Sequence, residues 1–184
     1  KNRLNQPGKR KKPAKIFVSS MGDLFGEWVP EKWIDQVIEV ANNCPQHIFQ
    51  FLTKNPAKYY NFDFPDNCWL GASADNANDA YCRSEILSTL DSDNIKFLSL
   101  EPLFEDVAEY IDYSGVDWII VGAQTGTNSK QPKGKWVDDI IQSCNHHKIP
   151  VFIKDNLDWK LMSDLVDFPS NRQEFPMEVL DDET

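Results

Sequence analysis

Six short apolar runs constrain the fold of this chain more than any other feature of its sequence. Each run is rich in Val, Ile, Leu, Phe and Trp, and successive runs start 21 to 33 residues apart. The runs are KIFVSS (15–20), HIFQFLT (47–53), CWLGAS (68–73), KFLSLE (96–101), DWIIVGA (117–123) and PVFIKD (150–155). Near-continuous apolarity is typical of strands that are buried on both faces, as in parallel sheets.

The residues between the runs predict helices. Residues 30–44 open with proline and carry a stripe of apolar side chains, and residues 75–90 and 133–148 are also helical in pattern. Residues 102–116 are less clear and fit either a loop or a loop with a short helix. Because strands that alternate with helices form parallel sheets with right-handed crossovers, we expect an α/β fold.

A partial barrel fits this pattern better than a doubly wound sheet. The sequence contains neither a glycine-rich dinucleotide turn nor a Walker phosphate loop. A complete barrel of eight β/α units needs about 250 residues, and this sequence has 184. We therefore expect a partial (β/α) barrel of about six parallel strands, TIM-barrel-like, over residues 15–158. Residues 1–14 would form a basic leader, and residues 159–184 an acidic extension.

Charge is distributed unevenly along the chain. The formal net charge is −10, yet the first fifteen residues hold seven Lys or Arg and no acid. The acidic remainder does not offer a broad surface for phosphate groups, so only residues 1–15 could contact nucleic acid or an acidic partner. The simpler alternative is a solvated, partly disordered leader. No apolar run is long enough to span a membrane and no signal peptide is apparent, so we expect a cytoplasmic protein.

The four cysteines are dispersed. They are Cys44, Cys68, Cys82 and Cys144, and their spacings do not match a zinc or iron–sulfur motif. A disulfide framework is not expected in a chain of this size without secretion signals. The cysteines therefore read as buried free thiols.

Polar residues follow every apolar run at the point where the strand should end. In parallel β/α folds the carboxyl ends of the strands gather at one rim, where catalytic and binding residues lie. The candidate site residues at these ends are Ser20, Met21, Asp23, Thr53, Lys54, Ser73, Asp75, Glu101, Gln124, Thr125, Lys154 and Asp155, all of them polar except Met21. The alternative is structural. Thr53, Ser73 and Asp75 could cap helices, and Glu101 and Lys154 could form a salt bridge across the barrel mouth.

Several motifs, taken together and in order, resemble a known family. They are MGDLFGEWVPEKWID, FQFLTKNP, CWLGASADN, LSLEPLFEDV, DWIIVGAQTG, IPVFIKDNL and RQEFP. The chain resembles, over about residues 15–176, a phage-associated family of uncharacterised proteins that looks like a relative of the radical SAM enzymes. Members of that family carry three clustered cysteines near the N-terminus, which this sequence lacks. Either the chain starts after the cysteine-bearing segment, of which the basic leader would be a remnant, or this protein has lost that segment. We expect the first.

The resemblance implies a cofactor, and it divides the rim residues into those that contact the cofactor and those that face the substrate. It implies that the intact family protein holds S-adenosylmethionine and a [4Fe–4S] cluster, and that the cysteines of this chain bind no cluster. The residues that it implies for cofactor contact are Ser20, Met21, Asp23, Thr53, Ser73 and Asp75. On the substrate side, the resemblance implies Glu101, Lys154, Gln124 and Thr125. We add Lys54 and Asp155 as candidate substrate contacts.

Three functions remain open from the sequence. The first is the barrel portion of a radical-SAM-like iron–sulfur enzyme of unknown substrate. The second is a cluster-free barrel enzyme in which Lys154 forms a Schiff base and Glu101 transfers protons. The third is a non-catalytic module that binds a phage or host partner. If the rim is one site, Asp23, Glu101, Gln124 and Lys154 should share one concavity, with Glu101 and Lys154 within reach of each other.

Overall fold

The structure, a computed structural model, describes residues 3–158 and 172–176. Most of the expected acidic extension (159–184) therefore lies outside the described residues. None of the helices in the described part of the chain is long and apolar enough to cross a membrane.

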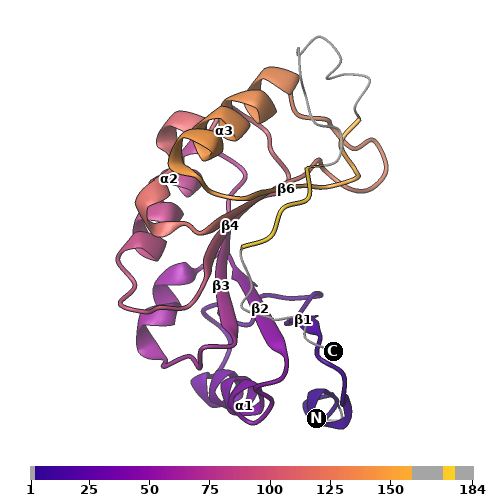
Figure 1. Ribbon diagram of the computed structural model, residues 1–184, viewed down its shortest axis with the longest axis vertical. Coiled ribbons are helices and arrows are strands. Elements are labelled where there is room, and N and C mark those ends of the chain that lie inside the picture. The colour runs from indigo at the N-terminus through magenta and orange to yellow at the C-terminus, as the bar shows by residue number, and fades with distance from the viewer. Residues whose placement is uncertain (1–2, 159–171, 177–184) are drawn as a thin grey trace.

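Within the described residues, one sheet of six parallel strands forms a curled half-barrel (Figure 1). The strands follow one another in sequence order across the sheet, and each pairs in parallel with the next. They are β1 (Lys15–Phe17), β2 (Ile48–Thr53), β3 (Cys68–Ser73), β4 (Lys96–Leu100), β5 (Trp118–Val121) and β6 (Val151–Ile153). The predicted α/β partial barrel of six parallel strands is confirmed.

Three α-helices and four 3-10 helices connect the strands. The α-helices are α1 (Glu31–Asn42), α2 (Ala77–Ser88) and α3 (Gly134–His147). The 3-10 helices are η1 (Pro7–Lys9), η2 (Pro56–Asn61), η3 (Ala108–Tyr110) and η4 (Tyr113–Gly115). The cap of α2 is Asn76, whose side chain accepts a hydrogen bond from the Asp79 amide. Helix α3 ends where Lys148 takes a left-handed conformation. Between β4 and β5 the chain crosses over with 3-10 turns only.

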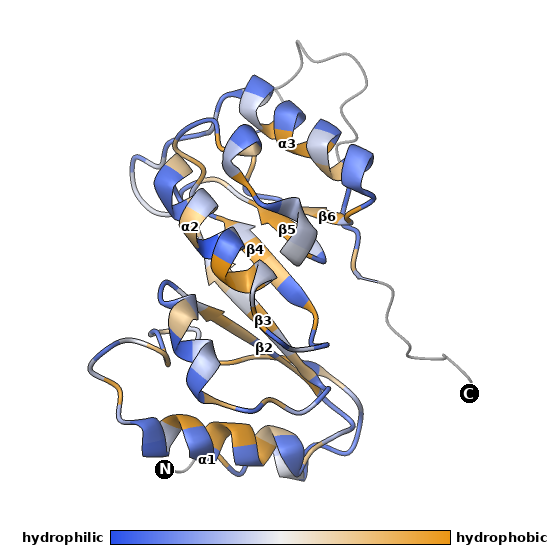
Figure 2. Cartoon of the chain, turned by 90° about the vertical axis from the view of Figure 1, so that its left-hand side faces the viewer, coloured by the Kyte–Doolittle hydropathy of each residue, from blue (hydrophilic) through white to orange (hydrophobic). Residues whose placement is uncertain are grey.

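The two faces of the sheet are packed differently. The three α-helices lie on one side (Figures 1 and 2), where aliphatic side chains together with Phe25, Phe51 and Tyr59 form the larger core. The opposite, concave face carries a second cluster built on Trp69, Phe97 and Trp118. Phe97 pairs in register with Gly71 and Trp118, and a Cβ on Gly71 would lie 2.2 Å from the Phe97 ring. Glycine at this position therefore lets the aromatic ring lie flat against β3.

Residues 172–176, here called the closing segment, lie along β6 on the concave side. Gln173 forms an antiparallel bridge with Phe152, and Glu174 N donates to the carbonyl of Val151 at 3.0 Å. The Trp118 indole N–H donates to the carbonyl of Glu174 at 2.8 Å. Figure 1 shows this yellow segment crossing from β6 toward β1. The closing segment thus covers the free edge of β6 and part of the concave aromatic cluster.

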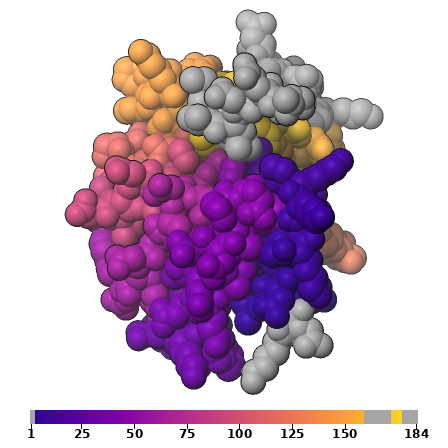
Figure 3. All heavy atoms as spheres, turned by 60° about the horizontal axis from the view of Figure 1, so that its bottom comes forward, coloured from indigo at the N-terminus to yellow at the C-terminus, as the bar shows by residue number. Residues whose placement is uncertain are grey.

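The basic leader lies against the body of the protein. His47, which precedes β2 and is fully buried, brings its Nε2 atom to 3.1 Å from the carbonyl oxygens of Pro7 and Arg10. Figure 3 shows the indigo N-terminal residues packed beside the purple region that follows them. The described part of the leader is therefore fixed to the protein through its backbone, while its basic side chains are exposed from Lys9 to Lys12.

Candidate functional site

The centre of the candidate site is an ion pair between the ends of two strands. Side chains alternate between the two faces of a strand, so Glu101 follows Phe97 and Ser99 on the concave face, and Lys154 follows Phe152. Lys154 Nζ lies 2.5 Å from Glu101 Oε2. The Lys154 side chain is 41% exposed and the Glu101 side chain 22%. The pair is thus open to a ligand, and the expected contact between these two side chains is present.

Gly122 allows this pair to form. It follows β5, the strand between β4 and β6, and is itself buried. A Cβ at this position would lie 3.0 Å from Lys154 Cδ and 3.1 Å from Glu101 Cδ. Those separations are shorter than ordinary van der Waals contact, so any larger residue would press on both side chains. Glu101 and Lys154 therefore meet above Gly122, which follows β5 and carries no side chain.

A cavity of about 370 Å³ lies beside the pair. It is lined by Glu101, Thr125, Phe152, Lys154, Asp155, Asn156 and Gln173. Asn156 fixes the rim at this point, because its amide group accepts from Ala123 N and donates to Ala123 O. Four of the residues predicted from the sequence thus come together here. We call this cavity and its lining the rim site.

Gln124 forms hydrogen bonds within its own loop. Its side-chain oxygen accepts a hydrogen bond from Lys130 N at 3.1 Å, and its backbone N–H donates to the Lys130 carbonyl. The loop after β5 is closed by these two contacts. Among the described residues, neither Gln124 nor Asp23 lines the rim site.

Three other predicted residues hold the exits of β1–β3. Asp23 accepts from the backbone N–H groups of Phe25 and Lys54, both at 2.9 Å. Thr53 is buried and accepts from Asn55 N. Asp75 accepts from the Asn76 amide at 2.7 Å and lies 3.6 Å from Lys54 Nζ. Asp23 and Thr53 thus bind backbone N–H groups, while Asp75 contacts two side chains. Thr53 and Asp75 do not take the helix-capping role that the sequence left open, because Asn55 precedes η2 and Asn76 caps α2.

Ser20 and Met21 lie elsewhere. Both line a cavity of about 670 Å³ between the leader, β1 and α1, and Met21 is almost fully exposed. The carbonyl of Ser73 accepts a hydrogen bond from the Arg83 guanidinium. The six residues expected to contact a cofactor are therefore spread over the β1 edge and the β1–β3 exits.

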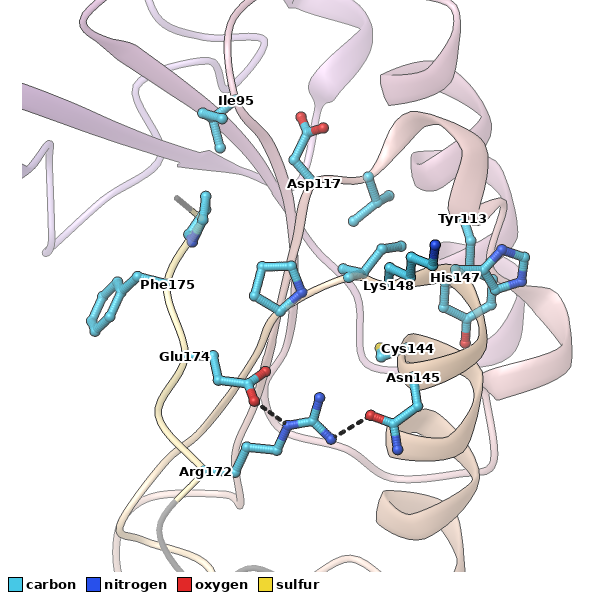
Figure 4. A pocket seen from close by; sticks show the side chains of 14 residues that line it. Ile95, Tyr113, Asp117, Cys144, Asn145, His147, Lys148, Arg172, Glu174 and Phe175 are labelled. Atoms are coloured by element: carbon cyan, nitrogen blue, oxygen red, sulfur yellow. Dashed lines mark hydrogen bonds and ion pairs between the residues drawn. The ribbon is translucent and has the colours of Figure 1, made fainter. Parts of the chain in front are cut away.

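A further cavity, also of about 670 Å³, lies at the amino ends of the strands, away from the rim (Figure 4). Arg172 spans part of it, with Nε 2.9 Å from Glu174 Oε1 and Nη1 2.7 Å from Asn145 Oδ1. The contact with Asn145 ties the closing segment to α3, and the contact with Glu174 lies within the closing segment. Because polar groups at the amino ends of a β/α barrel serve stability, we read this cavity as structural.

The comparison with protein families gives one result. A family described as "protein of unknown function (DUF5131)" matches residues 1–178. The chain belongs to the DUF5131 family. No curated protein and no solved structure matches it. The family description assigns no activity, so the function of this DUF5131 chain has to be argued from the rim site.

The cysteines of this DUF5131 chain do not form a cluster site. Cys44 is buried in the loop after α1, Cys68 and Cys144 are buried in β3 and α3, and Cys82 is exposed on α2. In the part of the chain that the structure describes, no three His, Cys, Asp or Glu side chains are grouped so that they could hold a metal ion. The described residues therefore do not fit a [4Fe–4S] cluster, and we derive no chemical step through one.

Thiol reactivity tests this placement. Burial raises the pKa of the Cys68 and Cys144 thiols to about 12, so both stay protonated and unreactive well above neutral pH. We expect one thiol per native chain, Cys82, to react rapidly with Ellman's reagent between pH 8 and 10. All four thiols should react in concentrated urea. A second rapidly reacting thiol in the native protein at pH 8 would contradict the burial described here.

Sequence reasoning missed three residues of the site. Gly122 lies inside an apolar run, Asn156 follows two charged residues at a strand exit, and Gln173 lies 19 residues beyond Lys154. Only Asn156 had a usable signal, since it extends the polar exit after β6. The roles of Gly122 and Gln173 depend on neighbouring strands, which the sequence does not reveal.

Proposed function

We propose that this chain is the barrel of an enzyme that acts on a small molecule bound in the rim site. The observation that supports the proposal is the Glu101–Lys154 pair, which lies on the concave face at the carboxyl ends of the strands and beside a cavity of about 370 Å³. Active sites of β/α barrels lie at this end, and cavities of this size suit small ligands.

The pair offers two kinds of chemistry. In its charged form the Lys154 ammonium can stabilise negative charge that develops on a substrate oxygen, while the Glu101 carboxylate accepts a proton from the substrate. If instead the ammonium passes one proton to Glu101, the neutral amine can add to a carbonyl carbon. Loss of water then leaves a Schiff base, and Glu101 can supply the proton that the leaving oxygen needs.

A radical-SAM-like function is the second candidate. Two observations favour it, namely the motif resemblance to a phage-associated, radical-SAM-like family and the sequential order of the six parallel strands. S-adenosylmethionine and an iron–sulfur cluster would then supply the radical chemistry. The described residues provide no ligands for the cluster, so this candidate assigns to the chain only the substrate-binding rim.

A thermal-shift screen tests both candidates. A ligand that binds only the folded protein raises its melting temperature, and the rise grows with the logarithm of the ratio of ligand concentration to Kd once the ligand is in excess. We expect small polar metabolites to stabilise the wild type but not the Lys154→Met variant, and S-adenosylmethionine belongs in the same screen. The matched control is Lys135→Met, which removes a lysine from an exposed ion pair on α3.

The outcomes separate the candidates. Stabilisation by S-adenosylmethionine favours the radical-SAM-like function, and stabilisation by other metabolites alone favours the cluster-free enzyme. If no compound distinguishes Lys154→Met from Lys135→Met, the rim site does not bind small molecules. A partner-binding module would then be the better explanation.

A further inference from the structure

The closing segment contributes a side chain to the rim site. Gln173 lines the cavity beside Glu101 and Lys154. Its Nε2 atom donates to Asp155 Oδ1 at 2.8 Å and lies 3.4 Å from the carbonyl oxygen of Ile153. A residue distant in sequence therefore holds the carboxylate that directly follows Lys154.

Two carboxylates and one ammonium group line the rim site. Lys154 pairs with Glu101, and no contact between Lys154 and Asp155 occurs among the described residues. Asp155 lines the same cavity and instead accepts from the neutral Gln173 amide. A second carboxylate near Lys154 would hold it more firmly in the charged form and draw it from Glu101.

We propose that Gln173 is a positioning residue of the rim site, which keeps Asp155 away from Lys154 so that Lys154 pairs with Glu101 alone. The inference rests on the proposed function, because it assigns a role within the same site. Its physical basis is a hydrogen bond from an amide to a carboxylate, which fixes the carboxylate without neutralising it.

The closing segment is held firmly enough to act in this way. Besides the bridge at Gln173, Ile153 N donates to the Arg172 carbonyl at 2.8 Å, and Val151 N donates to Glu174 Oε2 at 3.0 Å. The centroids of the Phe175 and Trp118 rings lie 5.3 Å apart. Lys15 Nζ, on β1, lies 3.7 Å from the centroid of the Phe175 ring. The segment thus contacts both β6 and β1, the two outer strands of the half-barrel.

Because these contacts do not use the Gln173 side chain, that side chain can be replaced without removing them. Gln173→Leu removes the amide at similar volume and leaves the backbone contacts of Arg172 and Glu174 in place. We therefore expect the variant to fold, with a melting temperature close to that of the wild type. Side-chain exposure at position 173 supports this expectation, because the residue is exposed and not part of the core.

The test measures how fast acetic anhydride acetylates Lys154, read by peptide mass spectrometry, because only a neutral amine is acetylated. In Gln173→Leu the released Asp155 should slow acetylation of Lys154 about threefold to fivefold, the size expected for a partly exposed ion pair. Lys32, an exposed lysine of α1, is the internal control and should not change.

A double variant identifies the cause. In Gln173→Leu/Asp155→Asn the rate at Lys154 should return to the wild-type value, and Asp155→Asn alone should leave that rate unchanged. An unchanged rate in Gln173→Leu, or a slow rate that persists in the double variant, would overturn the proposal. Because acetylation needs no ligand, this result is independent of the thermal-shift screen, so failure of one proposal is distinguishable from failure of the other.

Discussion

Replacing Trp118 by alanine lowers the free energy of unfolding by about 3–5 kcal/mol, the usual cost of removing a large buried aromatic side chain. Trp118 is 3% exposed at the centre of the concave cluster. Its ring contacts Trp69 and Phe97 at centroid distances of 5.6 Å, and its indole N–H binds the closing segment. The substitution thus removes packing between β3, β4 and β5 and frees the Glu174 carbonyl.

Urea denaturation followed by circular dichroism measures this loss. The matched control is Trp28→Ala, because Trp28 is 79% exposed and its removal should change the free energy of unfolding by no more than about 0.5 kcal/mol. Trp118→Phe should fall between the two, since it keeps an aromatic ring but loses the hydrogen bond. A loss below about 1 kcal/mol for Trp118→Ala would mean that the concave face is not packed as described.

The sheet was predictable because burial leaves a strong signal in the sequence. Strands covered by helices on one face and by aromatic or closing residues on the other are apolar along most of their length, so each apolar run contains a strand. The connection between β4 and β5 was harder to predict. Its apolar residues Leu103, Val107 and Ile111 are buried, yet their spacing fits neither a long helix nor a strand.

The rim was only partly predictable. A charge at the end of an apolar run needs water or a partner, and this argument correctly brings Glu101 to Lys154. The same argument does not distinguish them from Asp23, whose carboxylate instead binds two backbone N–H groups. Whether a carboxylate at a strand exit faces a cavity or its own loop depends on local turn geometry, which single residues do not encode.

Glu101→Gln should lower turnover of the substrate found by the screen by about 10²–10⁴-fold, the usual contribution of a positioned acid–base group. Glutamine has nearly the same shape but cannot accept a proton from the substrate or hold the Lys154 charge. The pair is partly exposed, so the free energy of unfolding should change by less than about 1 kcal/mol. Glu101→Gln should therefore lose turnover while its free energy of unfolding hardly changes. If the salt bridge were purely structural, turnover would not fall while stability is kept.

Companion variants test whether the two side chains act as one unit. Lys154→Met should lose about as much turnover as Glu101→Gln, and the double variant should lose little more than either, because groups that act together are not additive. Gly122→Ala should cause a smaller loss, since its Cβ would lie 3.0–3.1 Å from both side chains. Asp139→Asn is the charge-matched control, because it breaks the exposed Lys135–Asp139 pair on α3 and should leave turnover unchanged. Steady-state kinetics and urea denaturation measure the two effects, and a fully active Glu101→Gln enzyme would rule out a role for this pair in catalysis.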